Sequence, residues 1–398
     1  MINIQEAAED ITWIGGSDRR LARFENLFPL EHGVSYNSYV VKDDKTVLFD
    51  TADVSVADQY LENLNAALGE KMPDYIVVLH MEPAHCALLS VVHQLYPSAV
   101  IVCSMQASNM IRQFFPELGS AGFRIVKEGD TLETGKHTFH FIAAPMVHWP
   151  EVLMAFDDAT GSLFSADAFG TFGSLDDSIF ADDYDFDRRF LDEARRYYAN
   201  IVGKYGMQVT SVLKKASGLA IQRILPLHGP VWRKDLSIFI GKYQKWSSYT
   251  PETDDTLVVY GSLYGHTAEA ANSFAYALRA KTGKTVRVFD ASKTDVSWLI
   301  EEVWRCGKIV LFCPTYNGGI YPPVEHFLSD LQALSVQNRT FALAENGTWA
   351  PAAAKLMRAR LETLKNVTIV DEVLSFRSAL HASDSEKLDA FADAVANA

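Results

Sequence analysis

The segment that follows the apolar run at residues 75–79 constrains this chain more than any other. The run is typical of a buried strand, and His80, Glu82 and His85 come directly after it. Side chains two apart on an extended chain point to the same side, so the first two lie together and the third lies just beyond. Imidazole and carboxylate groups placed in this way suit a metal ion at a strand-to-helix turn. Taken alone, such a trio of common polar residues recurs by chance in many chains.

Three further candidate ligands lie downstream, and each of them ends an apolar run. They are His148, Asp167 and His228. Loops that follow strands converge at one edge of a layered sheet, and sites are commonly built there from several loops. We therefore expect one metal site, made from His80, Glu82, His85, His148, Asp167 and His228.

The second half of the chain carries a loop of small and hydroxylated residues at 261–267. A short apolar strand is predicted before this loop, at 257–260, and a helical run after it, at 268–280. Such a loop leaves backbone N–H groups and hydroxyls free at the positive end of a helix, where they hold a phosphate. It contains no lysine, so it does not fit the Gly-Lys-Ser/Thr loop of nucleotide triphosphatases. The candidate phosphate-binding residues are Ser262, Leu263, Tyr264, Gly265, His266 and Thr267.

Two further loops follow apolar runs at residues 308–312 and 340–344. Each brings glycine and an aromatic residue to the carboxyl end of a predicted parallel strand, where open α/β sheets bind their ligands. Aromatic rings at such a position would cover a flavin isoalloxazine. The candidate residues are Pro314, Thr315, Tyr316, Asn317, Gly318, Gly319, Asn346, Gly347 and Trp349.

Length and composition fit two globular domains. The chain has 398 residues, of which 48% are hydrophobic, and chains of this length form about two to three domains. The polar stretch at residues 247–255 combines a proline with clustered acids, as linkers do. We therefore place the boundary near Pro251, with one domain at residues 1–250 and the other at 254–398.

Charge, termini and cysteines argue against several other classes of protein. The formal charge of −14 and the pI near 5.2 disfavour nucleic-acid binding, which needs clustered cations. The sequence shows no apolar run of membrane-spanning length and no secretory signal, so we expect a cytoplasmic protein without membrane contact. The four cysteines form no Cys-x-x-Cys pair, which argues against a zinc knuckle, a fused rubredoxin or a disulfide framework.

In combination, these motifs resemble the flavodiiron protein family over essentially the whole chain. The family has His-x-Glu-x-Asp-His at the first ligand cluster, and Ala84 replaces its aspartate here. His-Trp-Pro, Leu-Phe-Ser-x-Asp-Ala-Phe-Gly and His-Gly-Pro-Val-Trp-Arg are family phrases, and the loop at 261–267 resembles the flavodoxin phosphate loop. The resemblance implies an α/β chain, with an αββα metallo-β-lactamase-like sandwich followed by a doubly wound, flavodoxin-like parallel sheet.

The same resemblance implies one FMN and two iron ions per chain. The carboxylate lost at Ala84 belongs to the second iron, which keeps two imidazoles and the bridge, so we expect the protein to carry fewer than two metals as isolated. By position, one iron would take His80, Glu82 and His148, the other would take His85 and His228, and Asp167 would bridge them.

The function implied by the family is electron delivery through FMN to a diferrous pair, which reduces dioxygen to water or nitric oxide to nitrous oxide. In the family, the flavin of one protomer lies close to the metals of the other. A head-to-tail homodimer is therefore implied. With no rubredoxin fused to this chain, the electron donor would be a separate protein, such as a rubredoxin or a flavin reductase.

Departures from the family pattern gather around the metal ligands and leave three functions open. The family's Phe-His-Gly phrase, whose histidine lies close to the metals, is Phe24-Glu25-Asn26 here, and Glu25 either replaces the lost carboxylate or serves at the surface. The chain is then a diiron reductase with an altered site, an FMN electron carrier with a partial or empty site, or a zinc metallo-hydrolase. The hydrolase is the weakest, because Glu82 displaces a zinc histidine and hydrolysis needs no flavin.

Overall fold

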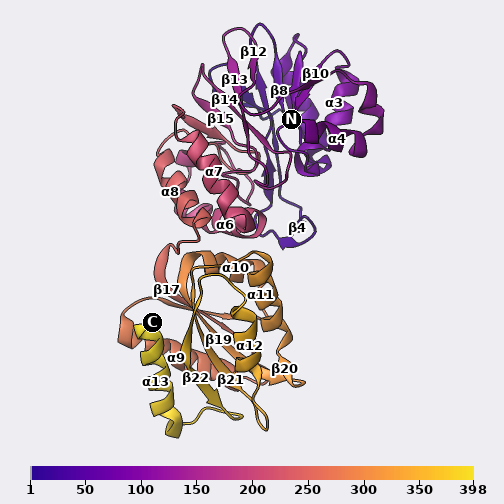
Figure 1. Ribbon diagram of the computed structural model, residues 1–398. Coiled ribbons are helices and arrows are strands. Elements are labelled where there is room, and N and C mark those ends of the chain that lie inside the picture. The colour runs from indigo at the N-terminus through magenta and orange to yellow at the C-terminus, as the bar shows by residue number, and fades with distance from the viewer. Residues whose placement is uncertain (1) are drawn as a thin grey trace. The chain divides into compact units, whose positions relative to one another are not determined.

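The computed structural model describes residues 2–398, which form two compact units (Figure 1). The first unit runs to Tyr198 and includes Met207–Gln244, while the second contains Ala199–Gly206 and Lys245–Ala398. Among the described residues, no helix is long and apolar enough to cross a membrane.

Two β-sheets form the centre of the first unit. The larger sheet has, in spatial order, β1 (Gln5–Ala8), β2 (Ile11–Trp13), β7 (Tyr39–Val41), β8 (Val47–Phe49), β9 (Tyr75–Val77), β10 (Val100–Cys103) and β11 (Phe123–Ile125). The smaller sheet has β12 (Thr131–Glu133), β13 (Thr138–Ala143), β14 (Leu153–Asp157), β15 (Ser162–Phe164) and β16 (Arg223–Leu225). Two short ribbons accompany them, pairing β3 (Gly16–Asp18) with β6 (Val34–Tyr36) and β4 (Arg23–Phe24) with β5 (Phe28–Pro29).

The two sheets pack face to face through buried aromatic side chains. Phe49 of β8 stacks on Phe164 of β15 with ring centroids 4.0 Å apart, and it meets Phe139 of β13 edge-on at 5.0 Å. Aromatic pairs at these separations add to the free energy gained by burying their area. The inner faces of both sheets therefore share one core.

Helices cover the outer faces of this sandwich, which confirms the expected αββα layers (Figure 1). The helices of the first half are α1 (Ala57–Leu68), α2 (Pro83–Cys86), α3 (Leu89–Leu95) and α4 (Met105–Phe114), with short turns η1 (Val54–Val56) and η2 (Pro116–Ser120). Those of the second half are α5 (Phe186–Arg189), α6 (Leu191–Tyr197), α7 (Gly206–Ala216) and α8 (Leu236–Ser247), with η3 (Ala181–Asp183), η4 (Tyr198–Val202) and η5 (Gly203–Tyr205).

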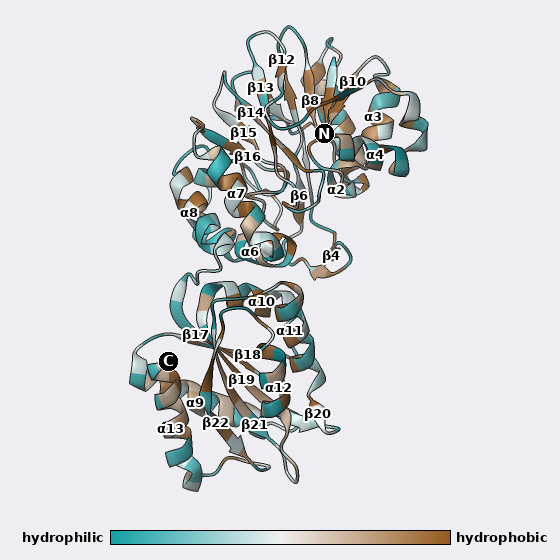
Figure 2. Ribbon diagram, in the orientation of Figure 1, coloured by the Kyte–Doolittle hydropathy of each residue, from teal (hydrophilic) through white to brown (hydrophobic). Residues whose placement is uncertain are grey.

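The second unit is built on one parallel sheet, whose strands are the most hydrophobic part of the unit in Figure 2. In chain order the strands lie 2-1-3-4-5, which is the doubly wound order in which ligands bind at the carboxyl ends of the first and third strands. The flavodoxin-like prediction is thereby confirmed. The spatial order is β18 (Val286–Asp290), β17 (Thr253–Tyr260), β19 (Cys306–Tyr316), β21 (Thr340–Asn346) and β22 (Thr368–Phe376).

Helices lie on both faces of this sheet. Phe274 and Phe391 pack with Phe312 of β19 in one buried cluster, so the helices that carry them share a face. These two helices are α9 (His266–Thr282) and α13 (Ser385–Asn397), the latter preceded by η6 (Ala382–Asp384). The opposite face carries α10 (Val296–Arg305), α11 (Pro322–Ala333) and α12 (Ala353–Leu361).

Two segments expected to be irregular belong partly to strands. β19 continues to Tyr316, so only Asn317 and Gly318 turn the chain back into β20 (Gly319–Ile320). Both turn residues have positive φ, 50° and 74°, as a two-residue hairpin turn requires, and Asn-Gly adopts it readily. Similarly, β17 begins at Thr253, which pairs with Cys306, so the end of the predicted linker is strand.

Candidate functional site

The six predicted ligands of the first unit come from loops that follow four strands. His80 lies three residues beyond β9, and the carboxylate of Asp50 holds this bend by accepting hydrogen bonds from the N–H groups of Leu79 and His80, at 2.8 and 3.2 Å. Pro83 then starts the short helix α2, which contains His85. The other three ligands, His148, Asp167 and His228, follow β13, β15 and β16.

The structure brings all six side chains together, with Asp167 at the centre. Its Oδ2 lies 3.3 Å from Nε2 of His80 and 3.1 Å from Nε2 of His148, and its Oδ1 lies 3.1 Å from Nε2 of His85. The Oε2 atom of Glu82 lies 3.2 Å from Nε2 of His148. Ligand atoms within 4.8 Å of one another form two groups, His80, Glu82, His148 and Asp167, and Glu82, His85, Asp167 and His228.

Several of these donor atoms are buried and have no hydrogen-bond partner. They include both carboxylate oxygens of Asp167, both ring nitrogens of His85 and Nε2 of His228. Buried polar atoms without partners cost free energy. Cations at the centres of the two groups would satisfy them, because each atom faces the other members of its group. The residues present therefore fit a pair of metal ions.

Partners behind the ligands orient two of the imidazoles. Glu151 Oε1 lies 2.7 Å from Nδ1 of His80, and His228 Nδ1 donates to the carbonyl of Ser35 at 2.6 Å. In both rings the outer nitrogen is held and Nε2 faces the centre, as in metal-bound histidines of proteins. The sequence analysis missed Glu151 and Ser35, and no motif marked either residue.

The charges of the ligands are set by one another. Burial alone would raise the pKa of Asp167, but the neighbouring imidazoles hold it well below its usual range. Burial would also lower the pKa of His148, yet hydrogen bonds with Asp167 and Glu82 raise it to about 9. Burial together with the adjacent His85 lowers the pKa of His228 to about 4, so this imidazole is neutral and ready to coordinate.

Ala84 and Glu25, the two departures seen in the sequence, both adjoin these ligands. Ala84 lies in α2 with 6% of its surface exposed, and its methyl group offers no donor. Glu25 lies on the surface in the turn between β4 and β5, yet its carboxyl group is hydrogen-bonded to that of Glu82. Burial of the carboxyl group and the charge of Glu82 raise the pKa of Glu25 to about 7.

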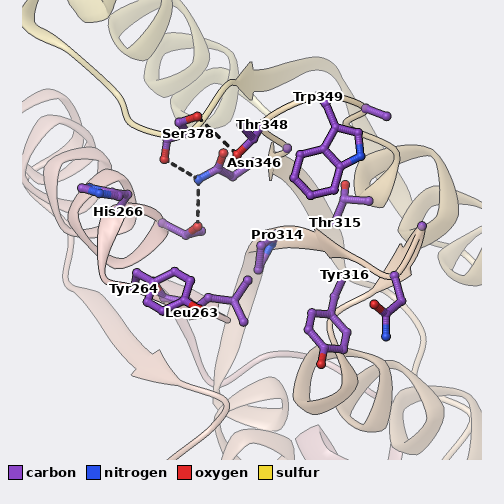
Figure 3. Close-up of a pocket in the computed structure, with 16 residues that line it drawn as sticks. Leu263, Tyr264, His266, Pro314, Thr315, Tyr316, Asn346, Thr348, Trp349 and Ser378 are labelled. Carbon is purple, nitrogen blue, oxygen red and sulfur yellow. Dashed lines mark hydrogen bonds between the residues drawn. The ribbon is translucent and has the colours of Figure 1, made fainter.

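In the second unit, the predicted flavin loops line one cavity of about 460 Å³ at the carboxyl ends of β17, β19 and β21 (Figure 3). Of the predicted residues, only Gly265 and Gly319 do not line it. Thr348, Ala350 and Ser378 line it without having been predicted. Ser378 comes from a fourth loop, after β22, which carried no recognisable phrase.

The phosphate loop at the start of α9 offers neutral donors. The Ser262 Oγ accepts hydrogen bonds from the N–H groups of Gly265 and Ala268, at 3.1 and 3.3 Å, which closes the loop onto the helix. Asn346 Nδ2 donates to Thr267 Oγ1 at 3.2 Å and to the carbonyl of Ser378 at 3.0 Å (Figure 3). These bonds tie three loops together at the end of the cavity where the helix N-terminus favours an anion.

Comparison with known proteins agrees with both halves of this description. Residues 34–229 match the family model described as ODP family beta lactamase, and residues 258–392 match the flavodoxin model. The fold and site therefore define a metal-binding lactamase-like domain joined to a flavin-binding domain.

The anaerobic nitric oxide reductase flavorubredoxin of Aliivibrio salmonicida is 30% identical over 359 residues, which cover 88% of this chain and 71% of that protein. The rubredoxin oxygen:oxidoreductase of Desulfovibrio gigas superposes with a TM-score of 0.92 at 25% identity, over 99% of this chain and 98% of that one. The flavodiiron protein of Giardia intestinalis gives a TM-score of 0.93 at 24% identity, over 100% and 97%. This chain belongs to the flavodiiron protein family.

Proposed function

We propose that this protein is an FMN-dependent diiron oxidoreductase that reduces nitric oxide to nitrous oxide, dioxygen to water, or both. The observation that carries the proposal is the pair of ligand groups that share Glu82 and Asp167 and contain buried donors without partners. The flavin cavity in the same chain adds support, because a redox cofactor has no role in hydrolysis. The printed names of the Aliivibrio and Desulfovibrio relatives support both diatomic substrates.

Ferrous ions in these groups would bind and polarise a diatomic substrate, and FMN would supply the electrons. Asp167 presents one oxygen to each group, so its carboxylate sets the spacing of the pair. Glu151 holds His80 from behind, and Phe24 packs edge-on against His228 with ring centroids 5.2 Å apart. These contacts limit ring rotation and shield the ligands from water.

We also infer a head-to-tail homodimer with a separate electron donor, a rubredoxin or a flavin reductase. The name of the Desulfovibrio relative supports a rubredoxin. Around the flavin cavity, Tyr264 and Trp349 expose 93% and 85% of their surfaces. Exposed aromatic side chains are enriched where proteins bind one another, so a partner would approach the flavin here.

One observation favours a second candidate function. Ala84 contributes only a methyl group beside the ligands His85 and His228. If this loss prevents the second metal from binding, the protein is an FMN electron carrier with a partial metal site. The flavin cavity serves either function, so only the metal content and turnover separate them.

The test loads full-length protein with FMN and Fe²⁺ without oxygen, and counts iron per FMN. The flavin is then reduced and mixed with nitric oxide or dioxygen, while flavin reoxidation and nitrous oxide are followed. We expect two irons and rapid turnover, and we expect Asp167→Asn to abolish turnover while its flavin still reduces normally. Asp176→Asn, which removes a surface carboxylate paired with Arg19, is the matched control. An Asp167→Asn variant as active as the native protein would refute the proposal.

A further inference from the structure

The turn between β4 and β5 brings a third carboxylate to the metal ligands. The carboxyl group of Glu25 is hydrogen-bonded to that of Glu82 and lies close enough to His148 and Asp167 for their charges to act on it. Two carboxyl groups in contact repel each other when both are ionised, unless a cation or a proton lies between them. The position of Glu25 is therefore one in which a bound cation relieves a repulsion.

The hairpin holds Glu25 at this place. Phe24, the preceding residue, is 2% exposed and packs against the ring of His228. The N–H of Leu27 donates to the carbonyl of Phe24 at 2.9 Å and closes the turn. Glu25 and Asn26 have φ values of 49° and 55°, which residues other than glycine adopt at a cost in free energy. The hairpin thus keeps Glu25 beside the ligands through a buried anchor.

The donor set lacks negative charge without this residue. Both ligand groups share the same two carboxylates, Glu82 and Asp167, and the rest of each group is imidazole. Two divalent cations carry four positive charges, so two carboxylates balance half of them. Ala84 adds no oxygen, and Nε2 of His85 and of His228 are buried without a partner. A hard oxygen donor from one more carboxylate would suit iron.

We propose that Glu25 is a carboxylate ligand of the metal pair, bound on the side of Glu82, and that it supplies the charge that Ala84 does not. The inference rests on the proposed function only in requiring that two metals bind. It makes the β4–β5 hairpin part of the metal site.

The test compares Glu25→Gln with the native full-length protein. Glutamine keeps the size of the side chain and removes its charge. Glu31→Gln is the matched control, because Glu31 is an exposed carboxylate of the same region that faces Glu193. Each protein is loaded with ⁵⁷Fe²⁺ without oxygen, its iron affinity is measured by competition with a chelator, and its Mössbauer spectrum is recorded.

We expect Glu25→Gln to weaken one of the two irons by at least the roughly 10–100-fold that follows loss of an outer partner, and to change its Mössbauer signal. Glu31→Gln should match the native protein. Adding Ala84→Asp to Glu25→Gln should restore the second iron, which a merely misfolded variant would not allow.

Two results would overturn the inference, and they are distinguishable. If the native protein and Glu25→Gln bind two irons with the same affinity and spectrum, Glu25 is not a ligand although the proposed diiron function stands. If the native protein fails to bind two irons, both the inference and the proposed function fail.

Discussion

Replacing Thr267 by aspartate tests the flavin site at its phosphate end. Thr267 is 3% exposed, lines the cavity at the start of α9, and accepts a hydrogen bond from Asn346. The side chains of this loop offer the phosphate hydroxyl and amide donors. An aspartate at this position would add a negative charge beside the anion, whereas Thr267→Asn adds a side chain of the same shape without charge.

The size of the effect follows from Coulomb's law. Two unit charges about 5 Å apart interact by about 0.8 kcal/mol in water and about 3 kcal/mol at an effective dielectric constant of about 20. A phosphate monoester carries about −1.5 to −2 charges near neutral pH. The aspartate variant should therefore bind FMN about 1–6 kcal/mol more weakly than the asparagine variant. This is a factor of roughly 10 to 10⁴ in Kd.

The assay titrates flavin-free protein with FMN at pH 8, where the new carboxylate is ionised, and follows quenching of flavin fluorescence. Riboflavin, which lacks the phosphate, is the matched ligand, and its affinity should be equal in the two variants. Equal FMN affinity of Thr267→Asp and Thr267→Asn would refute the placement of the phosphate at Ser262 to Thr267. An equal loss for riboflavin would mean that the mutation damages the cavity as a whole.

Three further outcomes are expected. The fragment 254–398 should fold and bind FMN, and the longer 245–398, which keeps the packing of Tyr249 on Trp304, should unfold at a higher temperature; recovery of only flavin-free aggregates would contradict this. Ala84→Asp should raise iron affinity roughly 10–100-fold, and unchanged iron per FMN in a chelator competition would contradict it. Burial would lower the pKa of His137, but its hydrogen bond to Asp157, at 3.0 Å, raises it above 6.5. Its stabilisation is therefore complete below the unfolded pKa and lost as pH rises through the folded one, so His137→Gln should destabilise by about 1.5–3 kcal/mol at pH 5.5 and by less at pH 9, as measured by denaturant unfolding.

The fold and most of the candidate site were predictable because their signals are local. A buried strand followed by His80, Glu82 and His85 encodes a turn with ligands on it, and the loop at 261–267 encodes a helix N-terminus open to an anion. Each signal depends on a few neighbouring residues, and the order of the signals along the chain matched one family. The extent of β19 was underestimated, because the Asn317–Gly318 turn allows the strand to run on to Tyr316 before it reverses.

Sequence alone determined the two domain types, the six metal-ligand candidates and most of the flavin cavity, since strand periodicity and turn chemistry act over short distances. Tertiary structure alone decided which distant groups meet. Glu151 lies 71 residues from His80, Ser35 lies 193 from His228, and Asn346 lies 79 from Thr267. The place of Glu25 beside Glu82 was likewise settled only by folding. Such contacts depend on how loops from separate strands converge at a sheet edge, and no local pattern of side chains specifies that convergence.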